Sequence, residues 1–167
     1  ELIIYVADKC SNDKTFGATK LNKILFFSDF ISFSKHGKPI TGAEYMRLPK
    51  GPAPRRLVPI REEMNARGEI AIQKKELFGY FQSRIVPLRK PNLSGFTADQ
   101  LALVDKVIEA LWGHSASLVS DVSHQRAWRI TRDGETIPYE AALLSDDNLT
   151  DCEINRVREL NAVHEWE

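Results

Sequence analysis

The chain reads TKLNKILFFSDFISF from Thr19 to Phe33, and this stretch decides the fold. One face carries apolar residues at helical spacing, namely Leu21, Ile24, Phe27 and Ile31. Further apolar residues widen that face almost all the way round: Leu25, Phe26, Phe30 and Phe33. A helix that is apolar on nearly every side is normally buried in a core. We therefore expect a central helix from Thr19 to Lys35.

Both ends of this helix carry recognisable signals. Thr19 precedes the apolar run, where its hydroxyl is placed to cap the first backbone N–H groups. Gly37 is suited to the left-handed position after the last turn, and Pro39 prevents a restart. The pattern leaves an exposed strip for the charged residues, which are Lys20, Lys23, Asp29 and Lys35.

A proline-rich corner follows, reading KGPAP from Lys50 to Pro54. Its two prolines fix their φ angles and restrict the residues before them, so the corner is rigid and suited to present side chains to a partner. It equally suits a simple role as a joint that positions the next element. That element is a helix over residues 54–67, which kinks at Pro59 or begins near Val58.

The remaining elements flank this centre. Leu2 to Ala7 is continuously apolar and is interpreted as a buried helix. Alternating residues from Glu69 to Lys75 and from Tyr80 to Leu88 predict a β-hairpin, and Pro87 marks the second strand as an edge.

The second half reads as helical. Thr97 and Gln100 form a capping-box pattern before an apolar stripe, and Gly113 ends that helix. Ser115 is placed to cap the next helix, and Asp133-Gly134 predicts a turn. A second capping box, at residues 150–153, predicts a terminal helix. The fold class is therefore α+β: one mostly helical domain over residues 1–167, with five or six helices and a small antiparallel hairpin or sheet.

Net charge is zero, but its distribution is uneven. Residues 1–92 hold 17 Lys/Arg against 9 Asp/Glu, a balance of +8, and residues 93–167 hold 6 against 14, a balance of −8. Such asymmetry fits an acidic partner on one side and a basic one on the other, or two halves that complement each other within one fold.

Compartment signals are few. No apolar run is long enough for a membrane span, so we expect no membrane partner. Cys10 and Cys152 lie far apart without metal-ligand spacing, which predicts reduced cytoplasmic thiols.

Catalytic motifs are absent from the sequence. There is no nucleophile elbow, phosphate loop, dinucleotide fingerprint or His-Glu-x-x-His pair, and the four histidines are scattered. We therefore predict a protein that is not an enzyme and that needs no metal or organic cofactor. His124 and Trp128, four residues apart, would stack on one face of a helix.

Several short motifs, in order, carry a family resemblance. They are KLNKILFF from Lys20, HGKPI from His36, KGP from Lys50, and LVSDVSH from Leu118 followed by Trp128 and by IPY from Ile137. This order resembles the signature of the Panacea domain, the SocA-like antitoxin family, over most of residues 1–145. One departure is Lys50, which replaces the aromatic residue that usually precedes Gly-Pro in that family.

The resemblance implies an antitoxin that binds a co-encoded protein toxin and masks it, or in some cases hands it to a protease as an adaptor. We expect the partner surface to include the corner and its neighbours, namely Lys50, Gly51, Pro52, Arg55 and Arg56, together with His124 and Trp128.

An alternative comes from the element order of residues 1–90, which is that of a winged-helix DNA-binding domain with residues 54–67 as recognition helix. Glu62 and Glu63 on that helix, and the long turn before it, weigh against this reading. DNA binding that weakens steeply with salt would support it.

Overall fold

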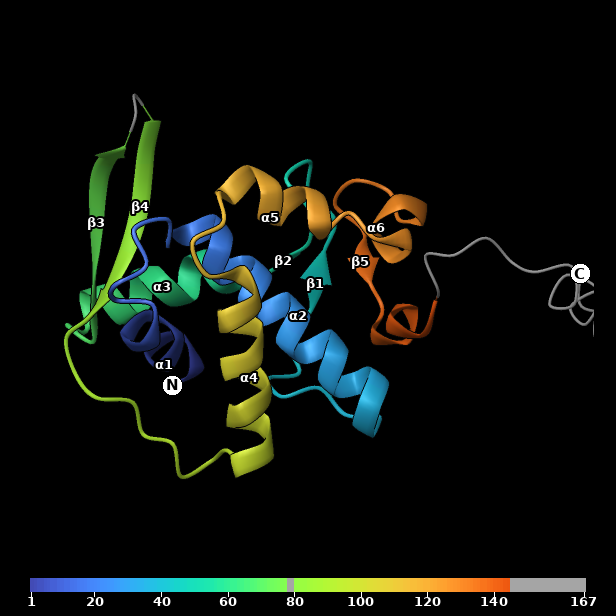
Figure 1. The fold of residues 1–167 in the computed structure, drawn as a ribbon, viewed down its shortest axis with the longest axis horizontal. Helices are drawn as coiled ribbons and strands as arrows, with labels where there is room; N and C mark the ends of the chain where they lie inside the picture. Colours follow the sequence, from blue (N-terminus) through green and yellow to red (C-terminus); the bar gives the residue numbers. More distant parts are fainter. Residues whose placement is uncertain (78–79, 145–167) are drawn as a thin grey trace, which may run out of the picture.

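The computed structural model describes residues 1–77 and 80–144 and has an α+β fold (Figure 1). The helices are α1 (Leu2–Lys9), α2 (Ala18–His36), α3 (Leu57–Ala66), α4 (Ala98–Leu111), α5 (Ala116–Val122), α6 (Arg126–Ile130) and the 3-10 helix η1 (Tyr139–Leu143). The strands are β1 (Tyr45–Met46), β2 (Ala53–Pro54), β3 (Ile70–Leu77), β4 (Tyr80–Pro87) and β5 (Thr136–Ile137).

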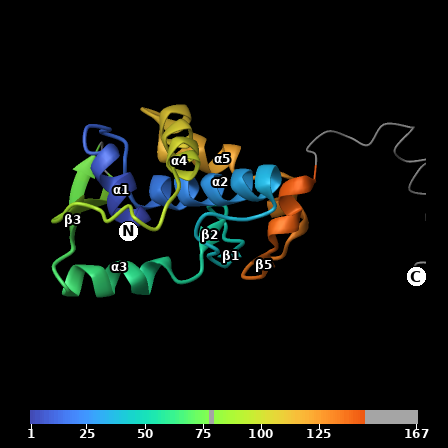
Figure 2. The same cartoon turned by 90° about the horizontal axis from the view of Figure 1, so that it is seen from below.

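Helix α2 is the centre of the fold, as its sequence predicts. It packs against α4, α5, β2 and η1, and Figure 2 shows it between α4 and α5 on one side and α3 with β1 and β2 on the other. Leu21 and Ile24 are fully buried in the larger of two apolar clusters, which α1 and α4 complete. Phe26 and Phe30 enter the second cluster, where their rings pack with those of Tyr45 and Tyr139.

The start of α2 differs from the prediction. The helix begins at Ala18 with Gly17 as its N-cap, and no side chain caps it, so the expected capping role of Thr19 is wrong. Gly17 lies against the side chain of Gln82 on β4. That close packing fixes where the chain enters the helix and places Thr19 inside its first turn. At the other end Gly37 adopts the expected left-handed conformation, with φ of 68°.

The expected charged strip of α2 is the main correction. Lys35 is exposed, but Lys20, Lys23 and Asp29 are buried, with 1%, 1% and 0% of their surface accessible. Burial of charge requires partners. Lys20 pairs with Asp13 at 2.7 Å, and Lys23 donates to the carbonyl oxygen of Pro52 at 2.7 Å.

Asp29 accepts hydrogen bonds from the loop that follows α2. The donors are the backbone N–H groups of Ile40 and Thr41, at 2.8 and 2.7 Å, and the hydroxyls of Thr41 and Tyr45. The Tyr139 hydroxyl adds a longer contact of 3.4 Å. The carboxylate therefore holds α2, its following loop, β1 and η1 together.

Most other predicted elements are confirmed. α1 covers the expected first helix, and α3 begins at Leu57, so that Pro59 lies in its first turn. The Thr97 capping box, the Ser115 cap and the turn at Gly134 are all present. The predicted terminal helix, its capping box at residues 150–153 and Cys152 lie outside the described residues.

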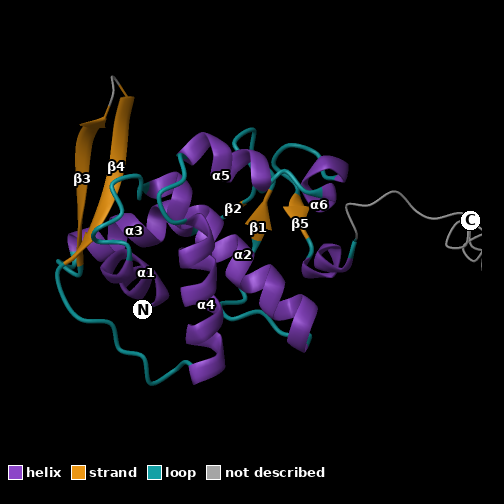
Figure 3. Cartoon of the chain, in the orientation of Figure 1, coloured by secondary structure: helices purple, strands orange, loops and turns teal. Residues whose placement is uncertain are grey.

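The strands form two antiparallel sheets. β3 and β4 make the predicted hairpin, with Ile72 opposite Ile85, and Figure 3 shows its far end projecting beyond the helices. Because β3 is the only strand that pairs with β4 in the described part of the chain, β4 is an edge strand there, as Pro87 indicates. The sequence did not predict the second sheet, in which the two-residue strands lie in the order β2-β1-β5.

Candidate functional site

The Gly-Pro corner, residues 50–54, is fixed from beneath by α2 and from the side by α5. Lys23 of α2 donates to the carbonyl of Pro52, and the Ser120 hydroxyl of α5 donates to the carbonyl of Lys50 at 2.6 Å. Gly51 and Pro52 are buried, while the side chain of Lys50 is exposed. The corner is thus a rigid joint that leaves one predicted binding residue, Lys50, at the surface.

Gly51 sits where no side chain fits. Its φ is 87°, in the left-handed region that favours glycine, and an added Cβ would lie 2.6 Å from the Lys23 amine and against the hydroxyl of Ser123. The glycine of the KGP motif is therefore required for close approach of the corner to α2 and to the end of α5.

Lys23 lies at the meeting point of these segments. Burial lowers the pKa of its amine to about 7, since water is removed and none of the described carboxylates pairs with it. The sequence pattern gave no sign of this environment, because it assigned Lys23 to solvent.

His124 and Trp128 stack, with ring centroids 3.9 Å apart and planes within 16°. The prediction of a stack is confirmed, although the two do not share one helix: His124 lies between α5 and α6. The Trp128 indole donates to the carbonyl of Leu48 at 3.0 Å, and the guanidinium of Arg47 lies over its ring at 4.2 Å. Trp128 therefore anchors the loop after β1 that leads into the corner.

The imidazole of His124 is a polar group without a full set of partners. Its Nε2 atom is buried and has no hydrogen-bond partner in the part of the chain that the structure describes. Burial, followed by the positive charge of Lys23, lowers its pKa below the usual range for histidine. A neutral imidazole has one nitrogen that donates and one that accepts, so the hydrogen-bonding capacity of the buried Nε2 atom is unused among the described residues.

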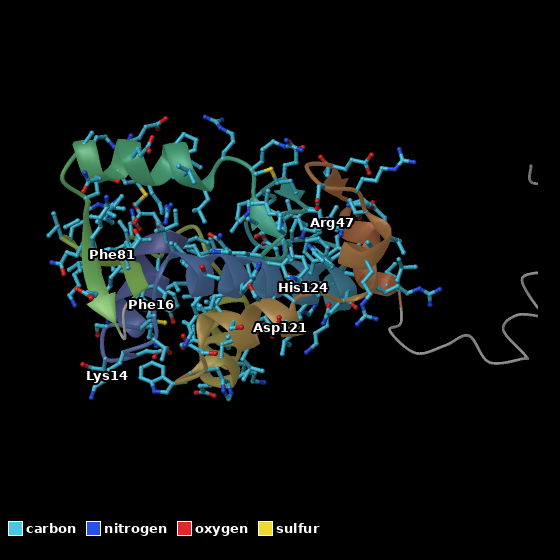
Figure 4. The ribbon with its side chains drawn as sticks, turned by 90° about the horizontal axis from the view of Figure 1, so that it is seen from above. Lys14, Phe16, Arg47, Phe81, Asp121 and His124 are labelled. Atoms are coloured by element: carbon cyan, nitrogen blue, oxygen red, sulfur yellow. The ribbon has the colours of Figure 1, made fainter. Side chains whose placement is uncertain are left out.

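A groove of about 910 Å³ opens beside the corner. Its walls come from the start of α2 (residues 17–20), the loop at Pro49 and Lys50, the β4 segment 81–83, and α5 with His124. Figure 4 shows Phe81 on the hairpin side, with Asp121 and His124 opposite. This volume falls in the range of sites that hold organic ligands or short peptide segments.

The groove has cationic side chains and one carboxylate. Lys20 lines it but is neutralised by Asp13. Although burial alone would raise the pKa of Asp13, hydrogen bonds from Lys20 and Thr15 lower it. Lys50 has no carboxylate partner among the described residues, and Asp121 follows Ser120, whose hydroxyl donates to the Lys50 carbonyl. A ligand with a carboxylate directed toward Lys50 suits this pattern.

The two arginines of the predicted surface lie on the other side of the corner. Arg55 contacts Glu44 at 2.9 Å and donates to the Gly134 carbonyl and the Thr136 hydroxyl. Arg56 is exposed at the start of α3. The structure thus brings Lys50, His124 and Trp128 together around one joint and places Arg55 and Arg56 on an adjoining surface.

The arginines of residues 54–67, the recognition helix of the winged-helix alternative, are partly engaged within the protein. Arg67 contacts Glu63 and Glu69, Arg55 contacts Glu44, and Arg61 is half-buried on α3. DNA binding stays a prediction, and these carboxylates would compete with phosphates for the same guanidinium groups.

Other classes of site find little support. Within residues 1–77 and 80–144 no group of three or more His, Cys, Asp or Glu side chains is arranged to hold a metal ion. None of the helices in those ranges is both long and apolar enough to cross a membrane. Cys10 is buried, which raises the pKa of its thiol to about 12 and leaves it protonated.

Comparison with known proteins places this site within a family. Comparisons with curated proteins and with solved structures gave no match. Residues 21–129 match the family model described as "Antitoxin SocA-like, Panacea domain". The match runs from the first turn of α2 into α6 and includes the corner, α5, His124 and Trp128. Because it spans well over half of the sequence, the chain belongs to the SocA-like antitoxin family with a Panacea domain.

Proposed function

We propose that this chain is an antitoxin that neutralises a co-encoded protein toxin by direct binding, either by masking it or by presenting it to a protease. Family membership over residues 21–129 carries the proposal. The action is stoichiometric binding without turnover of a substrate, and it calls for no metal or cofactor.

The proposed toxin-binding surface surrounds the corner. The joint formed by Lys23, Gly51 and Trp128 holds it rigid, so that little conformational entropy is lost on binding. Beside it, α5 exposes Leu118 and Val122, which are 46% and 53% accessible. These side chains lie four residues apart and therefore share one helical face. Exposed apolar groups beside a rigid charged corner suit a protein partner.

Arg55 and Arg56 extend this surface, and replacing both tests their role. We expect Arg55→Ala with Arg56→Ala to weaken capture of the toxin by at least about tenfold, because arginines are frequent interface hot spots. The contact of Arg55 with Glu44 is exposed and contributes little to stability, so the variant should melt within a few degrees of wild type.

Arg67→Ala, at the far end of α3, is the matched control and should bind normally. The measurement pairs a melting curve with a growth-rescue assay in cells that express the toxin. A double variant that melts normally and still protects cells fully would show that these arginines are outside the interface.

A further inference from the structure

The free edge of β4 offers backbone hydrogen-bonding groups to the groove. Leu88 donates its N–H to the carbonyl of Glu69, which fixes a hydrogen-bonded pair at the base of the hairpin. In an antiparallel pair such positions alternate along the strand. With the observed register, the N–H and C=O groups of Phe81 and Ser83 therefore point away from β3.

These outward groups lie in the groove and are unused. Residues 81–83 form one of its walls, and none of the described strands lies beside β4 on that side. No hydrogen bond to the backbone groups of Phe81 or Ser83 occurs among the described residues. An exposed edge of this kind is a template for a further strand.

The side chains of the groove complete the pattern that an extended segment needs. Phe81 is 80% exposed, so its ring can pack against an apolar side chain of a bound segment. Among the residues described, the Gln82 side-chain oxygen has no donor and the His124 Nε2 atom has no partner, and both atoms lie just beneath the lining of the groove. A peptide backbone supplies N–H and C=O groups alternately, which suits such a mixed lining better than an apolar ligand does.

Charge indicates which segment would fit. Lys50 is exposed and has no carboxylate partner among the residues described, and its backbone lies against α5, where its carbonyl accepts from the Ser120 hydroxyl. The uncapped N-terminus of α2, which forms another part of the groove, adds a partial positive charge. An acidic side chain near Lys50 would be favoured there, whereas near Asp121 it would be repelled.

We propose that the groove binds an extended peptide segment of the partner, which pairs with the free edge of β4 at Phe81 and Ser83 and places a carboxylate at Lys50. The inference rests on the proposed function, since the segment belongs to the toxin. Pairing at both positions takes about four residues of extended chain at about 3.4 Å each.

The test uses the full chain and a displayed library of short random peptides. We expect enrichment of peptides that carry Asp or Glu. Ser83→Pro removes the outward N–H and leaves the pairing with β3 intact, so it should weaken binding of a selected peptide by about tenfold. Ser83→Ala keeps the N–H and is the matched control, with binding unchanged.

Charge variants give effects of opposite sign. Lys50→Gln should weaken binding of an acidic peptide and Asp121→Asn should strengthen it, while Lys38→Gln, beyond the end of α2, should have no effect. If Ser83→Pro fails to fold, hydrogen exchange on the wild-type chain decides: the amides of Phe81 and Ser83 should become protected when peptide binds.

Several results would overturn the inference. The first is a library that yields no enriched peptide. The second is a selected peptide that binds Ser83→Pro as well as wild type and does not protect the amides of Phe81 and Ser83 from exchange. The third is a dimer of the chain that Ser83→Pro abolishes. The last result would assign the edge to a second copy.

If the toxin binds the wild type and Ser83→Pro equally well, the groove is not its site and the proposed function stands. If no toxin binds, the proposed function fails, and the peptide measurements alone then decide whether the groove binds an extended segment.

Discussion

Asp29 is the residue on which the largest number of segments converge. It is fully buried, and its carboxylate accepts from two backbone amides and the hydroxyls of Thr41, Tyr45 and Tyr139. A buried donor that loses its acceptor costs about 1–3 kcal/mol. The charge is thus kept in the core because several donors stabilise it together.

Replacing Asp29 should therefore destabilise the fold strongly. We expect Asp29→Ala to lower the free energy of unfolding by about 3–5 kcal/mol, since the amides of Ile40 and Thr41 and the Tyr45 hydroxyl all lose their acceptor. Tyr45→Phe removes one donor only and should cost about 1 kcal/mol. Urea denaturation measures both. Equal small losses would show that the carboxylate does not organise these segments.

Lys23 makes the stability depend on pH with a definite sign. Its folded-state pKa is lowered from 10.5 to about 7 by burial, whereas the unfolded chain holds the proton until about pH 10.5. Between these values the unfolded state binds more protons, so stability rises with pH by at most about 1.4 kcal/mol per pH unit. Below about pH 7 both states are protonated and this contribution is flat.

The measurement compares wild type with Lys23→Met from pH 6 to about pH 9.5. The difference between the two free energies of unfolding should change in favour of wild type as pH rises above about 7, because all other titrating groups cancel. Parallel curves would mean that the Lys23 amine keeps its ordinary pKa.

The Gly-Pro corner is the element on which the site depends. Gly51→Ala forces a residue with a Cβ atom into the left-handed conformation and brings that atom against Lys23 and Ser123. We therefore expect the free energy of unfolding to fall by about 2 kcal/mol or more. Gly134→Ala is a matched control, with φ of 80° but no atom near the added group, and should cost about 1 kcal/mol. Thermal melting compares them. If the two cost the same, close packing at the corner is unimportant.

At the scale of helices and strands, the sequence predicted the elements that local patterns encode. Helix α2, the hairpin, the Thr97 capping box and the edge character of β4 follow from periodicity, capping residues and Pro87. The strands β1, β2 and β5 were missed because two residues are too few for a pattern, and Tyr45 pairs with Ile137 from a distant segment.

The candidate site was predictable only in part. Motif order located the corner and His124 with Trp128, but the pattern of polar and apolar residues assigns charged side chains to solvent. It therefore missed Lys23 and Asp29, whose buried partners come from later segments: the carbonyl of Pro52, and the loop with Tyr45. The groove beside Phe81 depends on how β4 packs against α1 and α2 so that it faces α5 across the groove, which no local pattern encodes.

For the whole molecule, α2 provides the frame that supports the proposed binding region. It carries Lys23 beneath the corner, its first turn lines the groove, and α5 packs along it with Leu118 and Val122 outward. The hairpin supplies the opposite wall of the groove. Segments from both halves of the chain thus meet at this region, which is also where the family match lies.

The central claim is that this chain binds its toxin directly. The most direct test titrates the purified full chain into the purified product of the neighbouring reading frame, and follows heat of binding together with toxin activity. We predict a saturable, stoichiometric complex, with toxin activity falling in proportion to the antitoxin added. Two folded proteins that give no heat and no complex, with the toxin fully active in excess of this chain, would contradict the claim.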